Sequence, residues 1–273
     1  MKKSGISTKR KIRRNIIIIL LILIFFVYGF TLQTVIYKTE SDKITEKIKI
    51  VFLSDLHNCF YGGFDQSGLS KRIDNENPDI VIFGGDVVDQ YGGTKFALKI
   101  MSDTVKKYPC FYTAGNHERS RDDNKDFHQR VKNLGVKVLE GKNSKITVKN
   151  QKINIAGIVN ANYYNEESIS GLRSSDCYNI LIMHEPQQIA YVIDSGFDLI
   201  LSGHAHGGQW RLPFILEQGL YSPDQGIFPD YTNGIFHYDN TTHIISKGLA
   251  RPLRMIFIPR IYNRPEFTVI EIS

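Results

Sequence analysis

From residue 48 onward, short apolar runs alternate with segments that have apolar residues at helical spacing, and each apolar run stops at glycine or a polar residue. Brief apolar runs of this kind predict buried strands rather than helices. Five of them follow one another along the chain: IKIVFL, DIVIF, CFY, YNILIM and FDLIL. Helices are expected over residues 66–76 and 95–107, between the first three runs. Strands that alternate with helices predict a parallel or mixed sheet with helices outside it.

Two further strand-like stretches follow the third run and are joined by only a short turn. They are SKITVKN and KINIAGI, within residues 144–158, and their closeness predicts a hairpin with antiparallel pairing. The predicted fold is therefore α/β, with two facing mixed β-sheets rather than one flat sheet. We see no internal repeat and no second boundary after residue 47, so residues 48–273 form one predicted domain.

Aspartate and histidine recur where the apolar runs end. The residues concerned are Asp55, His57, Asp86, Asp89, Asn116, His117, Glu118, His184, His204 and His206. One such residue at a strand end is usually a turn or cap residue, but five ends in succession indicate a shared site, at the sheet edge where α/β proteins bind ligands. Imidazole, carboxylate and amide ligands together suit Mn, Fe, Zn or Co better than Mg.

The ordered signature DLH, GGDVVD, GNHE, H and GHAH resembles that of the calcineurin-like metallophosphoesterases, and the resemblance extends from Ile48 through the rest of the chain. It implies a four-layer αββα sandwich with a two-metal centre on the loops at the strand ends. By this resemblance the first metal is held by Asp55, His57 and His206, the second by Asn116, His184 and His204, and Asp86 bridges them. His117 would be the catalytic proton donor, oriented by Asp89, with Glu118 behind the ligands.

A pair of divalent metal ions accounts for these residue types. Two ions about 3.5–4 Å apart stabilise the attacking and leaving oxygens of an in-line displacement at phosphorus. They also lower the pKa of a bound water toward about 7, so that no side-chain nucleophile is required. The expected protein is a metal-dependent phosphoric ester hydrolase.

The first 47 residues have a different character. Residues 1–15 contain seven lysines and arginines and no acid, residues 16–37 are uncharged and largely apolar, and residues 38–47 form a polar linker. Because about 20 apolar residues span a bilayer, residues 16–37 are predicted to be a transmembrane signal anchor. The preceding cations predict a cytoplasmic N-terminus and a catalytic domain outside the cell membrane. A cleaved signal peptide and export by the twin-arginine route stay open.

The net charge of +6 comes from the basic tail, since removing its seven cations leaves a near-neutral body. No basic stripe interleaved with aromatic residues follows, so no nucleic-acid partner is expected. Cys59, Cys110 and Cys177 are odd in number and widely spaced, which indicates buried thiols rather than disulfides or a CxxC zinc site.

The segments GGQWRLPFILEQGL and YTNGIFHY and the stretch from Ser246 onward resemble the membrane-anchored or exported phosphodiesterase branch of this family, which includes enzymes similar to UDP-diacylglucosamine pyrophosphatases. The resemblance implies hydrolysis of a phosphodiester or pyrophosphate bond at the outer face of the membrane, and a lipid-linked substrate is one option. Trp210 and Arg211 are the candidate substrate residues. The alternatives are an extracellular nucleotide or cell-wall polymer phosphodiesterase and a non-catalytic metal-binding docking module.

Overall fold

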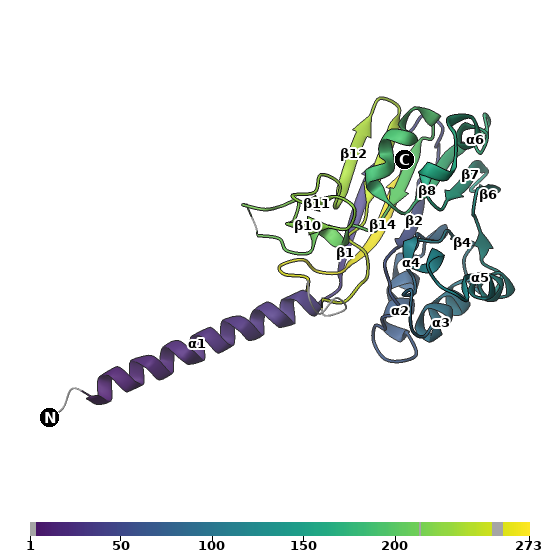
Figure 1. The fold of residues 1–273 in the computed structure, drawn as a ribbon. Helices are drawn as coiled ribbons and strands as arrows, with labels where there is room; N and C mark the ends of the chain where they lie inside the picture. Colours follow the sequence, from purple (N-terminus) through teal and green to yellow (C-terminus); the bar gives the residue numbers. More distant parts are fainter. Residues whose placement is uncertain (1–3, 213, 253–258) are drawn as a thin grey trace.

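The computed structural model describes residues 4–212, 214–252 and 259–273, without the side chains of residues 4–7 and 21–29. Helix α1, Ser4–Phe30, projects away from a body that holds the other helices and strands (Figure 1). In the described part of the chain we find no helix with both the length and the apolarity that crossing a bilayer requires. The anchor predicted over residues 16–37 falls partly on residues 21–29, whose side chains are outside the description, and partly on a strand.

The first sheet has the strand order β1-β14-β2-β3-β4-β5. Its strands are β1 Gln33–Thr39, β2 Ile48–Leu53, β3 Ile80–Phe83, β4 Cys110–Tyr112, β5 Lys137–Val138 and β14 Glu266–Ile272. Strands β2 to β5 are parallel to one another, β14 runs antiparallel to β2, and β1 lies parallel to β14. The first three predicted strands are therefore confirmed as neighbours in one mixed sheet.

The second sheet has the order β12-β13-β9-β8-β7-β6. Its strands are β6 Lys142–Val148, β7 Gln151–Ile158, β8 Tyr178–Met183, β9 Leu199–Ser202, β12 Gly234–Tyr238 and β13 Thr241–Ile245. The pairs β6·β7 and β12·β13 are antiparallel, whereas β7, β8, β9 and β13 are parallel. The predicted hairpin is thus β6·β7, and the prediction of an α/β fold with two mixed sheets is confirmed.

Three buried clusters define the layers of the body. The helices are α2 Ser67–Glu76, α3 Lys95–Thr104, α4 Asn116–Arg119, α5 Asn124–Asn133 and α6 Glu166–Ser170. One cluster joins the first sheet to α2, α3 and α5, a second joins the inner faces of the two sheets, and a third joins the second sheet to α6 and neighbouring 3-10 turns. Successive residues of a strand point to opposite faces of its sheet. Each sheet therefore contributes side chains both to the cluster between the sheets and to the cluster beneath its own helices.

Residues before the predicted boundary at Ile48 also pair and pack with the body. Strand β1 covers the end of the predicted span and the start of the predicted linker, and it pairs with β14 along its whole length. From Gln33 to Lys38 its side chains alternate between half-buried and exposed, and Thr39 is buried. Ile44 of the predicted linker is buried between the sheets. The uncharged run up to Tyr37 is therefore not one element, because its last residues satisfy their backbone hydrogen bonds in the sheet.

Candidate metal centre

The polar strand ends meet at one edge of the body. Asp55 and His57 follow β2, Asp86 follows β3, Asn116 and His117 follow β4, His184 follows β8, and His204 and His206 follow β9. Left-handed backbone with φ from 47° to 67° occurs at Asp55, His57, Asp86, His204 and His206. Residues other than glycine rarely adopt this conformation, and it concentrates at functional sites, where the surrounding fold compensates its cost.

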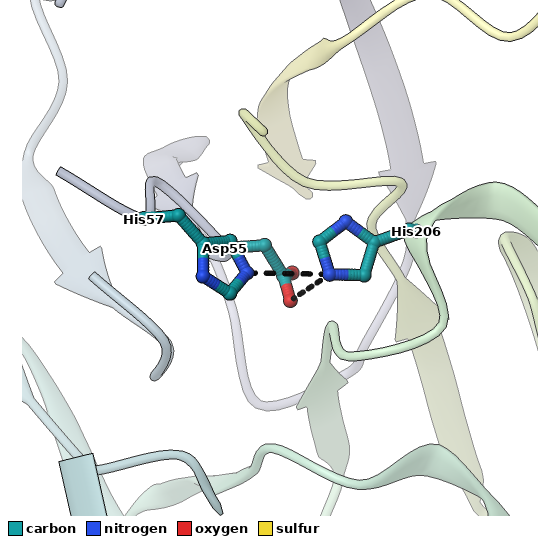
Figure 2. A group of neighbouring side chains, drawn as sticks. All are labelled: Asp55, His57 and His206. Atoms are coloured by element: carbon teal, nitrogen blue, oxygen red, sulfur yellow. Dashed lines mark hydrogen bonds and ion pairs between the residues drawn. The ribbon is translucent and has the colours of Figure 1, made fainter. Parts of the chain in front are cut away.

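Asp55, His57 and His206 form the first cluster, and all three side chains are buried (Figure 2). The Nε2 atoms of His57 and His206 are 3.2 Å apart, and His206 Nε2 lies 3.7 Å from Asp55 Oδ1. Burial opposes charge on His57, but its hydrogen bond with Asp89 and the nearby carboxylates of Asp86 and Asp55 raise its pKa. Two ring nitrogens and a carboxylate that converge in this way are donors that a transition-metal ion prefers.

Asp86, His184 and His204 form the second cluster and are also buried. Asp86 Oδ2 lies 3.2 Å from His184 Nε2 and 4.0 Å from His57 Nε2, so this carboxylate lies between the two clusters. Burial disfavours charge on His184, but Asp86 and then Asp55 raise its pKa to about 10. The carbonyl of Gly84 lies 2.8 Å from His184 Nδ1, which leaves Nε2 as the nitrogen that faces the cluster.

Asn116 Oδ1 and His184 Nε2 are among the buried polar atoms that meet no hydrogen-bond geometry with any described residue, although Asp86 Oδ2 lies 3.2 Å from the latter. A buried polar atom without a hydrogen bond costs about 1–3 kcal/mol, and coordination to a cation would satisfy both atoms. Carboxylates, imidazoles and one amide together fit divalent ions of the Mn, Fe, Zn or Co type. The two clusters are therefore candidate dimetal sites.

Two glycines let the backbone close around the carboxylates. A Cβ at Gly115 would lie 2.2 Å from Asp86 Oδ1, and one at Gly248 would lie 2.5 Å from Asp55 Oδ2. Gly248 also has a φ of 72°, which disfavours any side chain. Close backbone packing therefore restricts where both carboxylates can lie.

Glu118 ties the ends of β3 and β4 together. Its carboxylate accepts hydrogen bonds from the backbone amides of Asp86 and Gly115 at 2.8 Å and of Val88 at 2.9 Å. Burial, and then the neighbouring Asp86, raise the pKa of Glu118 to about 7, whereas the amide donors favour the carboxylate form. Glu118 thus fixes the two loops that carry Asp86 and Asn116.

Asp89 lies beside both His117, the histidine with which it is predicted to pair, and His57. Asp89 Oδ1 lies 2.7 Å from His57 Nδ1 but 3.9 Å from His117 Nδ1. His117 Nδ1 also accepts a hydrogen bond from the backbone amide of Gln90 at 3.3 Å. Asp89 therefore orients His57, whose Nε2 is directed into the first cluster, and the backbone orients His117.

The two predicted substrate residues differ in their surroundings. Trp210 is 39% exposed. The half-buried Arg211 donates to the Gly207 carbonyl at 3.0 Å and to the side chain of Asn233, so its guanidinium is already engaged by the protein. Arg211 also lines an open cleft of about 210 Å³ with Leu212, Leu216, Glu217 and Tyr262.

Two residues at the centre carried no usable signal in the sequence. The buried Arg260 donates a hydrogen bond to His206 Nδ1 at 3.2 Å, and Asp224 Oδ2 lies 3.0 Å from His204 Nε2. Neither residue follows one of the five apolar runs that predict strands. Asp224 belongs to the segment SPDQG, whose composition predicts a turn and nothing more.

Comparison with known proteins agrees with this geometry. The sequence profile of the calcineurin-like phosphoesterases matches residues 48–208. The chain is 27% identical over 234 residues to the uncharacterized metallophosphoesterase YkuE of Bacillus subtilis, which covers 82% of this chain and 79% of that relative. It is 25% identical over 232 residues to the phosphodiesterase YaeI of Escherichia coli, with 82% of each chain covered.

Solved structures share the fold at low sequence identity. TT1561 of Thermus thermophilus has a TM-score of 0.51 at 9% identity, covering 74% of this chain and 90% of that one. The NAD nucleotidase of Haemophilus influenzae has a TM-score of 0.50 at 16% identity, and this chain spans only 45% of its length. These two likenesses support the fold alone.

The family profile matches more than half of the chain and includes the strand ends that carry both clusters. Buried Asp and His residues are grouped there as a dimetal centre requires. The chain therefore belongs to the calcineurin-like phosphoesterase family and is a metallophosphoesterase, a metal-dependent hydrolase of phosphoric esters.

Proposed function

We propose that the chain hydrolyses a phosphodiester or pyrophosphate bond with two divalent metal ions. The observation that carries the proposal is the position of Asp86 between two buried clusters. Asp55, His57 and His206 would hold one ion, Asn116, His184 and His204 the other, and Asp86 would contact both. When bound, the ions supply positive charge to the phosphoryl oxygens and activate water. The description of the Escherichia coli relative as a phosphodiesterase supports a diester substrate.

His117 is the proton donor in this proposal. Its side chain is 34% exposed, unlike the buried ligands, and its Nε2 lies 3.8 Å from Asp86 Oδ2. Burial lowers the pKa of His117, so the ring is mainly neutral at pH 7. Because Nδ1 accepts the Gln90 amide, the neutral ring carries its proton on Nε2. The ring transfers a proton to the leaving oxygen of a bound ester from its imidazolium form, in which the Nε2 proton is the one given up.

The test of this role compares leaving groups in the full-length His117→Gln variant. A general acid contributes about 10²–10⁴-fold, and nitrophenolate needs less protonation than an alkoxide. We therefore expect a smaller loss of kcat on a bis-nitrophenyl phosphate than on an alkyl diester, with the metal content per chain unchanged. The matched control is His237→Gln, which replaces an exposed histidine.

Two outcomes would contradict the proposal. Equal losses on the two esters would exclude His117 as the proton donor. A wild-type chain that binds two ions but turns over neither a diester nor a pyrophosphate would instead favour the metal-binding docking module.

We further propose that the substrate carries an apolar group, as a lipid-linked phosphoester at the outer face of the cell membrane does. Support comes from an apolar rim, defined as the exposed side chains Trp210, Leu212, Phe214, Ile215, Ile227 and Phe228. The amide of Leu220 donates to the Trp210 carbonyl and that of Phe228 to the Leu220 carbonyl, so the rim segments are joined. Phe214 is 95% exposed, and apolar surface exposed to this extent typically marks a binding site.

The apolar rim is tested with a lipid pyrophosphate or glycerophospholipid in mixed micelles and with its water-soluble headgroup analogue. Burial of a phenylalanine side chain contributes about 1.5–3 kcal/mol, so Phe214→Ala should lower kcat/KM on the lipid by roughly 10–100-fold and leave the analogue unaffected. The control is Tyr191→Ala, another exposed aromatic residue. A preference for the analogue would favour the nucleotide or cell-wall polymer phosphodiesterase. Cell fractionation tests the proposed location.

A further inference from the structure

The turn between strands β10, Tyr221–Ser222, and β11, Gly226–Ile227, lies outside the matched family region and still reaches the second cluster. The two strands pair antiparallel, with Ser222 opposite Gly226. Asp224 lies in the turn with a left-handed φ of 60°. Its Oδ2 is 3.0 Å from His204 Nε2. A side chain far from the metal-site signature in sequence thus contacts one of its histidines.

We propose that Asp224 is a positioning residue that fixes the tautomer and the orientation of His204 for the second metal ion. The proposal rests on the metal assignment made above. A histidine can bind a metal ion only through an unprotonated ring nitrogen, and a carboxylate on the other nitrogen commonly sets which one that is. With the Asp224 carboxylate as acceptor the ring proton lies on Nε2, and Nδ1 is then the nitrogen that would bind the ion held with Asp86 and His184.

The backbone of His204 is held independently of its ring. The His204 amide donates to both carboxylate oxygens of Asp55, at 3.0 and 3.1 Å, and the residue has a φ of 67°. These contacts fix the position of the His204 backbone, but they determine neither the side-chain torsion angles nor the tautomer of the ring. The contact with Asp224 supplies the missing constraint, because it engages the far side of the ring.

The turn that carries Asp224 is braced against the rest of the chain. The Leu220 amide donates to the Gly208 carbonyl, four residues after His204. The side chain of Gln225 donates to the Tyr231 carbonyl at 2.8 Å and accepts the Tyr231 amide at 2.9 Å. Asp224 therefore approaches His204 from a fixed loop, as a residue that orients a ligand must.

The size of the effect follows from the exposure of Asp224. Loss of a residue that orients a metal ligand typically costs about 10–100-fold in metal affinity. The Asp224 side chain is 59% exposed, and solvent screens such contacts. We therefore expect about a 10-fold loss, at the lower end of that range.

The test uses the full-length Asp224→Asn variant, because asparagine keeps the shape of the side chain and tolerates left-handed backbone. The matched control is Asp239→Asn, since Asp239 is also an exposed aspartate at positive φ, in the β12·β13 turn. Titration of the metal-free protein with Mn²⁺ or Zn²⁺ should show one of two ions bound about 10-fold more weakly in Asp224→Asn. The other ion and the control should match the wild type.

A second measurement separates positioning from general destabilisation. In ¹⁵N-histidine-labelled, metal-free protein, the Nε2–H signal of His204 should be protected from exchange in the wild type and less protected in Asp224→Asn, because an amide oxygen is a weaker acceptor than a carboxylate. Asp224→Glu, which keeps the carboxylate, should restore part of that protection and part of the affinity. The resonance reports on the His204 ring, and the affinity reports on the ion that His204 would bind. A loss of global stability alone would not change these two readouts together and leave the other ion unaffected.

The outcomes are distinct. Equal metal affinities for Asp224→Asn and Asp239→Asn would overturn the inference, and so would a wild-type chain that binds fewer than two ions. If the wild type binds two ions, one of them weakened in Asp224→Asn, and yet hydrolyses no phosphoester, the positioning role stands and the proposed function fails.

Discussion

The buried imidazole of His243 should make the chain lose stability as the pH falls below about 6.5. The side chain is fully buried, and its Nε2 lies 2.9 Å from Ser202 Oγ. The Ser202 hydroxyl donates its own proton to the Met183 carbonyl, so His243 Nε2 must be the donor. His243 Nδ1 is then the unprotonated nitrogen, and it makes no hydrogen bond with any residue that the structure describes. Protonation would bury a charge there, and burial accordingly lowers the pKa of His243 to about 3.

The sign and the magnitude of the stability change follow from the pKa of His243 in the folded and in the unfolded chain. The folded-state pKa lies below the unfolded value of about 6.5, so between pH 6.5 and about 3 only the unfolded chain binds the proton. The contribution of the neutral ring is therefore fully present above pH 6.5 and is lost as the pH falls, by about 1.4 kcal/mol per pH unit. From pH 7.5 to 5 the loss amounts to about 2 kcal/mol.

The assay is urea unfolding of the metal-free, full-length chain over that pH range. His243→Gln can still donate to Ser202 and does not titrate, so its free energy of unfolding should fall by about 2 kcal/mol less than that of the wild type. His237→Gln, which removes an exposed histidine, should follow the wild type. Equal losses for His243→Gln and the wild type would show that the buried ring does not stay neutral, and would refute the reasoning.

Three further variants test the metal centre. Asp86→Ala should lose at least one of two bound ions in elemental analysis, because Asp86 lies between both clusters; full retention would contradict the bridging assignment. Glu118→Gln should lower the free energy of unfolding in urea by about 2–3 kcal/mol, because its amide group would face a backbone N–H; an unchanged midpoint would contradict the bracing role. Gly248→Ala should weaken binding of the ion held by Asp55 in a metal titration, because the new Cβ would displace that carboxylate. Gly226→Ala, at a similar φ of 74° but with open space around it, should leave this affinity unchanged. Equal effects of the two variants would assign the defect to backbone strain.

The fold was predictable wherever the residues of a strand form one continuous, largely apolar run with polar residues at both ends. The runs that became β3, β8 and β9 are buried along their whole length, and the run that became β2 is buried everywhere except at Lys49, so each one is visible as a short apolar run bounded by polar residues. Strand β1 was missed because its apolar residues continue those of α1 without a charge or a glycine cluster between them. Its identity as a strand depends on pairing with β14, a contact between distant parts of the chain.

The same distinction applies to the metal centre. The clustering of Asp55, His57, Asp86, His184 and His204 could be anticipated, because parallel strands bring their carboxyl ends to one edge. The hydrogen-bond partner of each imidazole could not be anticipated, because it depends on small differences between side-chain distances, such as 2.7 Å against 3.9 Å for the two contacts of Asp89. Asp89 was assigned to His117 by resemblance, and only the structure shows that it also engages His57, at a shorter distance.

The place of β14 between β1 and β2 has a consequence for biosynthesis. Strand β2 ends at Leu53 and its partner begins at Glu266, so at about 5–20 residues per second the ribosome needs roughly 10–40 s to deliver that partner. During this interval the nascent chain presents β1 and one side of β2 as open strand edges, and open edges pair readily with other chains. The first sheet is therefore completed only late in translation, and a chaperone that covers strand edges should raise the yield of the native protein more than one that acts after release.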